Sequence, residues 1–249
     1  VTTSSNEDVE LPYLSNGTYS GLVDWGDGQT SANAYSERTH TYATAGEYII
    51  NITGDTREMD FNGIDKTAYT ELISFGDDSS LNELSLIDFE NGLDMSNISD
   101  KPKFRAFSSI ESLLEDNNGA VNQIEDWDTS NVINMKRAFY SCSFNQPIGG
   151  WDVSNVVSME KMFRSAALFN QPLSNWDVGR VSNMSEMFAF STFFNQEISG
   201  WDVSNVTNMY RMFRQTPFNK TLLNWNVSKV ENMREMFSSA SSFNQPIGD

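Results

Sequence analysis

Carboxylates recur at one fixed place in the second half of this chain, directly after a tryptophan. The residues of this acidic column are Asp128, Asp152, Asp177 and Asp202, with Asn226 closing the series. If successive copies stack about 4.8 Å apart, neighbouring carboxylates repel by roughly 1 kcal/mol per pair in water. A local hydrogen bond from the backbone or from a serine two residues on would offset this repulsion, as in an Asx-type turn. Alternatively, the column binds cations or presents acceptors to the hydroxyls or amines of a partner.

Polar residues beside this column extend the candidate binding surface. They occupy outward positions just before each tryptophan, where the copies differ from one another. The ones that we single out are Ser174, Asn175, Ser199 and Asn224. Variation at exposed positions favours specific recognition over a plain scaffold. A second candidate surface carries basic residues: Lys136, Arg137, Lys161, Arg164, Arg211, Arg214 and Arg234.

Loop carboxylates in the first half offer oxygen ligands of the kind that calcium prefers. The candidates are Asp24, Asp27, Asp77 and Asp78, although no D-x-D-x-D-G spacing surrounds them. Calcium is therefore the one cofactor that the sequence leaves open.

The residue types needed for most catalysis are scarce. His40 is the only histidine and Cys142 the only cysteine, so we expect neither a zinc site nor a Cys–His dyad. No G-x-S-x-G motif is present. Chance carboxylate pairs stay open because the chain has 34 acidic residues. The sequence predicts that the protein is not an enzyme.

These residues lie on an internal repeat. FNQPIGGWDVSNV starts at Phe144 and returns in variant form at Phe169, Phe194 and Phe218, and FNQPIGD follows at Phe243. Successive tryptophans from Trp127 onward are 24, 25, 25 and 24 residues apart. A period near 25 residues is too short for two helices and suits one short strand plus one short helix per coil. The sequence therefore predicts an α/β repeat solenoid that resembles leucine-rich repeats.

The pattern inside one period locates the two elements. Trp151 and Val153, two residues apart, would face inward from a strand. Val156, Met159 and Phe163 then follow at helical spacing, so we expect a short amphipathic helix. Methionines in this stripe are core residues on this interpretation, and the asparagine that follows each Phe would satisfy backbone groups at a turn between coils.

Three regions are expected. Residues 1–60 are predicted to form a small β-rich module, residues 61–120 irregular capping coils, and residues 121–249 five repeats that continue beyond this chain. The first half is strongly acidic: residues 1–126 hold 24 Asp and Glu against 6 Lys and Arg, whereas residues 127–249 hold 10 of each. This excess argues against nucleic acid and anionic membranes as partners. No apolar run approaches the length of a membrane helix, and we expect a monomer.

Two sets of motifs in this chain resemble known protein families. WGDG at Trp25, HTY at His40 and AGEY at Ala45 together resemble PKD-like β modules. The WDVSNVxxMxxMF…FNQPIG repeats resemble the DUF285 family of bacterial surface-protein repeats, related to BspA-like leucine-rich repeats. The resemblance implies an extracellular, cell-surface location and a non-enzymatic binding or adhesion module for a protein or glycan. The alternative is a purely structural spacer that projects another domain.

Overall fold

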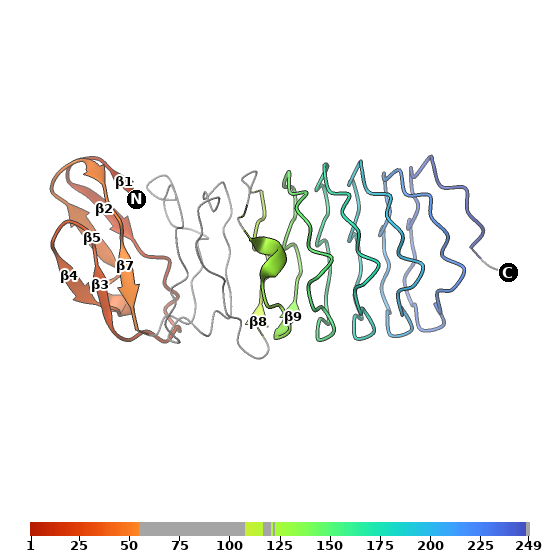
Figure 1. Ribbon diagram of the computed structural model, residues 1–249, viewed down its shortest axis with the longest axis horizontal. Helices are drawn as coiled ribbons and strands as arrows, with labels where there is room; N and C mark the ends of the chain where they lie inside the picture. The colour runs from red at the N-terminus through yellow and green to blue at the C-terminus, as the bar shows by residue number, and fades with distance from the viewer. Residues whose placement is uncertain (55–107, 117–120, 122, 248–249) are drawn as a thin grey trace.

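The computed structural model describes residues 1–54, 108–116, 121 and 123–247 (Figure 1). Within these ranges the elements are short strands, two 3-10 helices and many turns, and none is an α-helix. No helix there has the length and apolar character needed to cross a membrane. The predicted capping coils over 61–120 lie mostly outside the described residues, so the three-region division remains a prediction.

A small antiparallel β module forms the N-terminal part (Figure 1). β3 (Leu22–Asp24) pairs with β4 (Thr30–Ala32) and with β7 (Asn51–Thr53). β2 (Glu7–Glu10) pairs with β5 (Thr39–Tyr42) over four residues, and β1 (Thr2–Thr3) pairs with β6 (Gly46–Glu47). The 3-10 helix η1 (Tyr35–Glu37) connects β4 to β5.

The core of this module is small and aromatic. Val9 and Val23 point inward from strands whose alternate residues are more exposed, as strand geometry requires. Tyr42 is fully buried and donates its hydroxyl to the Trp25 carbonyl at 2.7 Å, which satisfies a polar group that burial would otherwise penalise.

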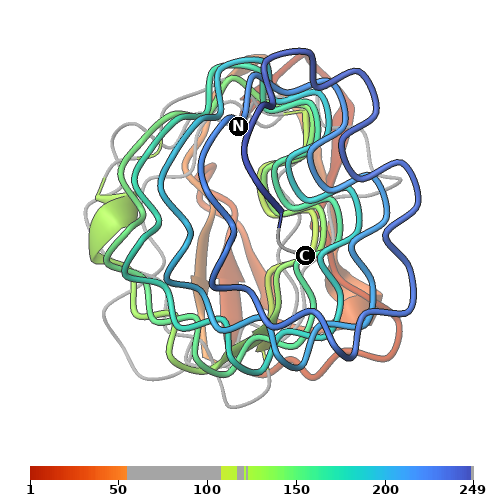
Figure 2. The same ribbon diagram turned by 90° about the vertical axis from the view of Figure 1, so that its right-hand side faces the viewer.

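The repeats form coils that lie side by side, one copy of the repeat to each coil (Figures 1 and 2). Parallel bridges join equivalent residues along the whole stack, from Asn134 through Ser158, Asn183 and Asn208 to Asn232. Regular secondary structure is sparse: the parallel pair of β8 (Ser108–Ser109) and β9 (Val132–Asn134), and the 3-10 helix η4 (Ile124–Asp126). We call this array the repeat stack.

Backbone hydrogen bonds between coils explain why each copy forms no helix. Met159, Lys161 and Phe163 donate their N–H groups to Asn183, Ser185 and Met187 of the next coil, at 2.9 Å each. The N–H groups of Met162 and Arg164 instead bond back three residues, to the Met159 and Lys161 carbonyls. An α-helix would direct all of these donors to carbonyls four residues earlier in the same segment.

Left-handed residues make this alternation possible. Lys161 and Ser165 have φ angles of 56° and 60°, and the equivalent pair recurs in every coil from 137 onward. Each such residue costs about 1–2 kcal/mol relative to the right-handed form. Residues 108–116 follow the same rule: Ser112 and Asp116 have positive φ, and both N–H groups reach the next coil. They therefore have the backbone of a repeat coil, although their sequence does not show the repeat pattern.

The predicted fold class, an α/β leucine-rich-repeat-like solenoid with a strand and a helix in each coil, is therefore wrong. The spacing of Val156, Met159 and Phe163 does mark an inward face, because all three are fully buried. A run of turns bonded to its neighbour yields the same inward spacing as a helix. The Trp151–Val153 segment forms no regular strand either.

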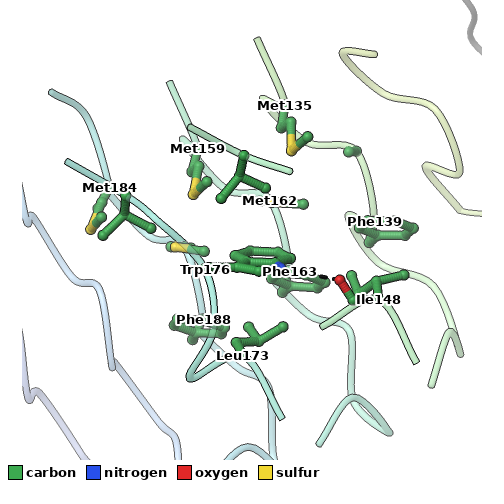
Figure 3. Close-up of a cluster of buried hydrophobic side chains, with 14 of the residues drawn as sticks. Met135, Phe139, Ile148, Met159, Met162, Phe163, Leu173, Trp176, Met184 and Phe188 are labelled. Carbon is green, nitrogen blue, oxygen red and sulfur yellow. Dashed lines mark hydrogen bonds between the residues drawn. The ribbon is translucent and has the colours of Figure 1, made fainter. Parts of the chain in front are cut away.

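Columns of like residues fill the interior of the repeat stack (Figure 3). Phe139, Phe163 and Phe188 stack with ring centroids 5.2 and 5.6 Å apart. Trp176 is buried and donates its indole N–H to the Ile148 carbonyl of the preceding coil at 3.0 Å. The equivalent indole bond recurs from Trp151, Trp201 and Trp225. Each tryptophan thus adds apolar area and fixes the position of its coil on the previous one.

Candidate functional site

The acidic column lies on the surface of the repeat stack, and each member is held by its own turn. Asp152 accepts the Ser154 N–H at 2.9 Å and Asp202 accepts the Ser204 N–H at 3.0 Å. Asn226 makes the same bond to Ser228 without a charge. The local Asx-type turn is confirmed. Equivalent bonds at 3.1 and 3.0 Å hold Asp128 and Asp177.

Hydrogen bonds also explain the acidity of two members. The Ser154 hydroxyl and then its N–H lower the pKa of Asp152, because both stabilise the ionised carboxylate. Ser204 lowers the pKa of Asp202 in the same order. Both residues are therefore ionised at neutral pH.

Polar residues beside the acidic column lie in the turn that precedes each tryptophan. The Trp176 N–H bonds back to the Leu173 carbonyl, so Ser174 and Asn175 form an exposed turn between them. Ser199 and Asn224 occupy the matching turns of the next two coils. The sequence-predicted binding residues thus share one surface of the stack, and their role in binding remains a prediction.

The calcium candidates in the β module already have hydrogen-bond partners. Asp24 accepts the Gly26 N–H at 2.9 Å, and Asp27 accepts the Gln29 N–H at 3.0 Å and pairs with His40 Nε2 at 2.9 Å. Burial raises the pKa of Asp27, but the His40 and Gln29 hydrogen bonds outweigh it, so the net shift is downward. No cluster of three metal-ligating side chains occurs among the described residues. Asp77 and Asp78 lie outside them.

His40 and Cys142 have structural surroundings. The His40 ring stacks on Trp25 at 4.8 Å and meets the edge of Tyr42 at 4.7 Å. Cys142 is buried, and burial raises the pKa of its thiol to about 12, so the reactive thiolate is absent at neutral pH.

The asparagine column after each Phe bonds one coil to the next. Asn170 donates its N–H to the Asn145 side chain at 3.0 Å, and Asn195 does the same to Asn170. The predicted satisfaction of backbone groups is confirmed, and the column is half-buried from Asn170 to Asn219 and exposed at its two ends.

The basic residues of the second candidate surface lie on the outward side of the left-handed turn segments. Acidic and aromatic residues stand among them at equivalent positions of successive coils. We call this surface the turn face, comprising Glu111, Glu115, Lys136, Arg137, Tyr140, Glu160, Lys161, Arg164, Glu186, Phe190, Tyr210, Arg211, Arg214, Arg234 and Glu235.

Ion pairs on the turn face run between coils. Arg137 binds Glu115 through two guanidinium nitrogens, and Arg164 Nε lies 2.8 Å from Glu186. Arg211 and Arg214 both reach Glu235, at 2.8 and 2.9 Å. The hydrogen bond to Arg211 lowers the pKa of Glu235, although burial opposes this shift.

Phe190 is the residue that departs most from its position on the turn face. Serine or glutamine fills the equivalent place at Ser141, Ser165, Gln215 and Ser239. Phe190 has a φ of 65°, a conformation that is costly for a bulky side chain.

Two guanidinium groups flank this ring. Arg164 of the preceding coil lies 5.0 Å from its centroid, and Arg214 of the following coil lies 5.7 Å away. Arg164 also donates to the Tyr140 hydroxyl at 2.6 Å. Sequence reasoning identified both arginines but missed Phe190. The signal was an aromatic residue in an otherwise polar column, with an arginine beside the equivalent position of each flanking coil.

The comparisons place the chain in a family. The family model described as "Mycoplasma protein of unknown function, DUF285" matches residues 108–217 and, in a second overlapping match, 180–249. Together the matches span more than half of the chain, which therefore belongs to the DUF285 family. No curated protein and no solved structure gave a match.

Proposed function

We propose that this chain is a non-enzymatic, extracellular binding module of a bacterial surface protein, whose repeat stack presents a long, shallow surface to a partner. The resemblance of residues 22–54 to PKD-like modules and the surface context associated with DUF285 repeats both support this proposal. Stacked repeat architectures commonly bind proteins or polymers along such surfaces.

The observation that carries the proposal is the contrast between core and turn face. Inward columns repeat the same residue types: every coil from Trp127 onward supplies a Trp, a Met and two Phe residues. The outward positions of the turn face do not repeat. One such column reads Arg137, Lys161, Glu186, Arg211 and Glu235 along the stack. A pure spacer gains nothing from side chains that differ in this way, whereas a recognition surface depends on them.

The turn face contains five arginines and two tyrosines, which are residue types that anchor protein interfaces. Arginine and tyrosine are enriched at interfaces, and hot spots form where such residues are partly desolvated. Arg164 and Arg214 have side chains only 25% and 26% exposed, so they are already partly desolvated and held in place. The acidic column, with Ser174, Asn175, Ser199 and Asn224, is the second candidate surface.

A binding screen tests the proposal. The purified chain, coupled to fluorescent beads to gain avidity, is incubated with animal cells, immobilised matrix proteins and a glycan array. We expect saturable binding to at least one of these. Protease or glycosidase treatment of the cells then identifies the partner as a protein or a glycan. Beads that bind nothing above those carrying an unrelated acidic protein would favour the spacer.

A further inference from the structure

We infer that Phe190, with Arg164 and Arg214 on either side, is an anchor site for an acidic protein segment, meaning a segment in which one or two carboxylates adjoin an apolar side chain. This inference rests on the proposed function and names its partner class.

The conformation of Phe190 is the first observation behind the inference. The fold sets a positive φ at this position in every coil, and a bulky side chain is less favourable there than serine. Ser141, Ser165 and Ser239 show that the coil accepts a smaller residue at the same backbone position. Phe190 therefore places an aromatic ring on the surface where the fold does not require one.

The chemistry of the flanking groups points to carboxylates. Guanidinium groups bind carboxylates through two parallel hydrogen bonds, and both arginines are held in place by ion pairs with Glu186 and Glu235. Among the described residues, Arg164 donates through Nε and Nη1 and Arg214 through Nη1, so each guanidinium keeps a further N–H donor for a partner carboxylate.

The arrangement of the ring argues for protein over glycan. Sugar rings stack on the open face of an aromatic side chain, but here a guanidinium from each neighbouring coil lies over the Phe190 ring. The ring edge is what a partner can contact, and a small apolar side chain such as leucine or valine suits that contact.

Charge excludes a polyanion as the natural partner. The turn face carries seven basic and five acidic residues, a balance of only +2, in a chain whose net charge is −18. Long-range repulsion would oppose nucleic acid or a sulfated polymer. A short segment with one or two carboxylates meets the local arginines without that penalty.

Selection from a random peptide library displayed on phage tests the inference without assuming a sequence. The full chain is the bait, and enriched peptides are resynthesised for affinity measurement. We expect Asp or Glu next to Leu, Val or Ile to be enriched. Salt should weaken the binding, because charge-assisted contacts at a surface are screened.

Matched variants locate the site. Phe190→Ser, which installs the residue that the preceding coil has at Ser165, is expected to weaken binding of the selected peptides about tenfold or more, as for an interface anchor. Arg214→Lys keeps the charge but loses the planar fork and should also weaken binding. Phe193→Ser removes an exposed ring, 59% accessible, from the same coil and should leave binding unchanged. Circular dichroism confirms that all three variants fold.

Each other outcome overturns the inference. If Phe190→Ser and the unmodified chain bind the selected peptides equally well, the peptides bind at another site. Enrichment of neutral or basic peptides, or preference for heparin over peptides, would reject an acidic protein segment as the partner. If cells or matrix still bind the chain while these outcomes are seen, the proposed function stands and only this anchor site fails.

Discussion

At the scale of the residue, short polar side chains set the turns of the repeat stack. The bond from Asp152 to the Ser154 N–H could be predicted from sequence, because aspartate commonly accepts from the backbone two residues on. Asn226 strengthened that prediction, since the position keeps its hydrogen bond without a charge. Phe190 could not be interpreted in the same way, because its contacts come from two other coils and depend on their exact register.

The turn role of the acidic column gives a mutational prediction. Asp152→Ala leaves the Ser154 N–H without its acceptor and should lower the free energy of unfolding by about 1 kcal/mol, the usual net contribution of a hydrogen bond. Asp152→Asn retains an acceptor, as Asn226 does, and should change it by less than about 0.5 kcal/mol. Urea unfolding followed by circular dichroism measures both.

Calcium separates this role from cation binding. If the acidic column bound calcium, millimolar calcium would raise the melting temperature of the unmodified chain and not that of Asp152→Ala. We expect no calcium-dependent difference between the two. A rise confined to the unmodified chain would show that the column holds the cation.

At the scale of the element, the sequence identified the inward residues but not the backbone that presents them. Val156, Met159 and Phe163 have helical spacing and are buried. The determining feature is the left-handed conformation of Lys161 and Ser165. Neither residue is glycine, so the sequence gives no sign of this conformation. Their strain is offset by hydrogen bonds to the next coil, and such bonds are invisible when one copy is considered alone.

The left-handed positions should therefore reject β-branched residues. Gln215 has a φ of 53°, is exposed, and donates its N–H to the Ser238 carbonyl at 2.9 Å. Gln215→Val should lower the free energy of unfolding by about 1–2 kcal/mol, because a branched Cβ is strained in this region. Gln215→Asn should be nearly neutral, since asparagine tolerates it. Equal stability of the two variants in urea would mean that this backbone is not left-handed in solution.

At the scale of the whole molecule, stacking turns a weak local pattern into one continuous core. The columns of Trp, Met and Phe could be predicted from the period alone, because equivalent residues of stacked copies must meet. The exposure of the same positions in the last described coil could not be predicted in this way. In the last described coil Val227 and Met233 are each 39% exposed, whereas the equivalent Val203 and Met209 are 1% and 0% exposed. Burial in this molecule is therefore a property of neighbouring coils rather than of one sequence segment.

Register between copies should then matter more than the number of copies. Deleting residues 183–207 removes one 25-residue copy and joins Ser182 to Asn208, so every column and bridge can re-form. Each coil contacts only its neighbours, and we expect a folded chain. Its urea m-value should be about a tenth smaller, because about a tenth of the chain is removed.

A half-copy deletion is the matched control. Removing residues 183–194 loses less sequence but leaves a coil without its Met184, Phe188 and Phe194, so the following tryptophan cannot reach its acceptor carbonyl. We expect this shorter deletion to unfold at lower urea, or not to fold at all, although more of the chain is retained. A half-copy variant as stable as the full-copy variant would contradict the requirement for register, because matched columns would then contribute no more than the length of chain retained.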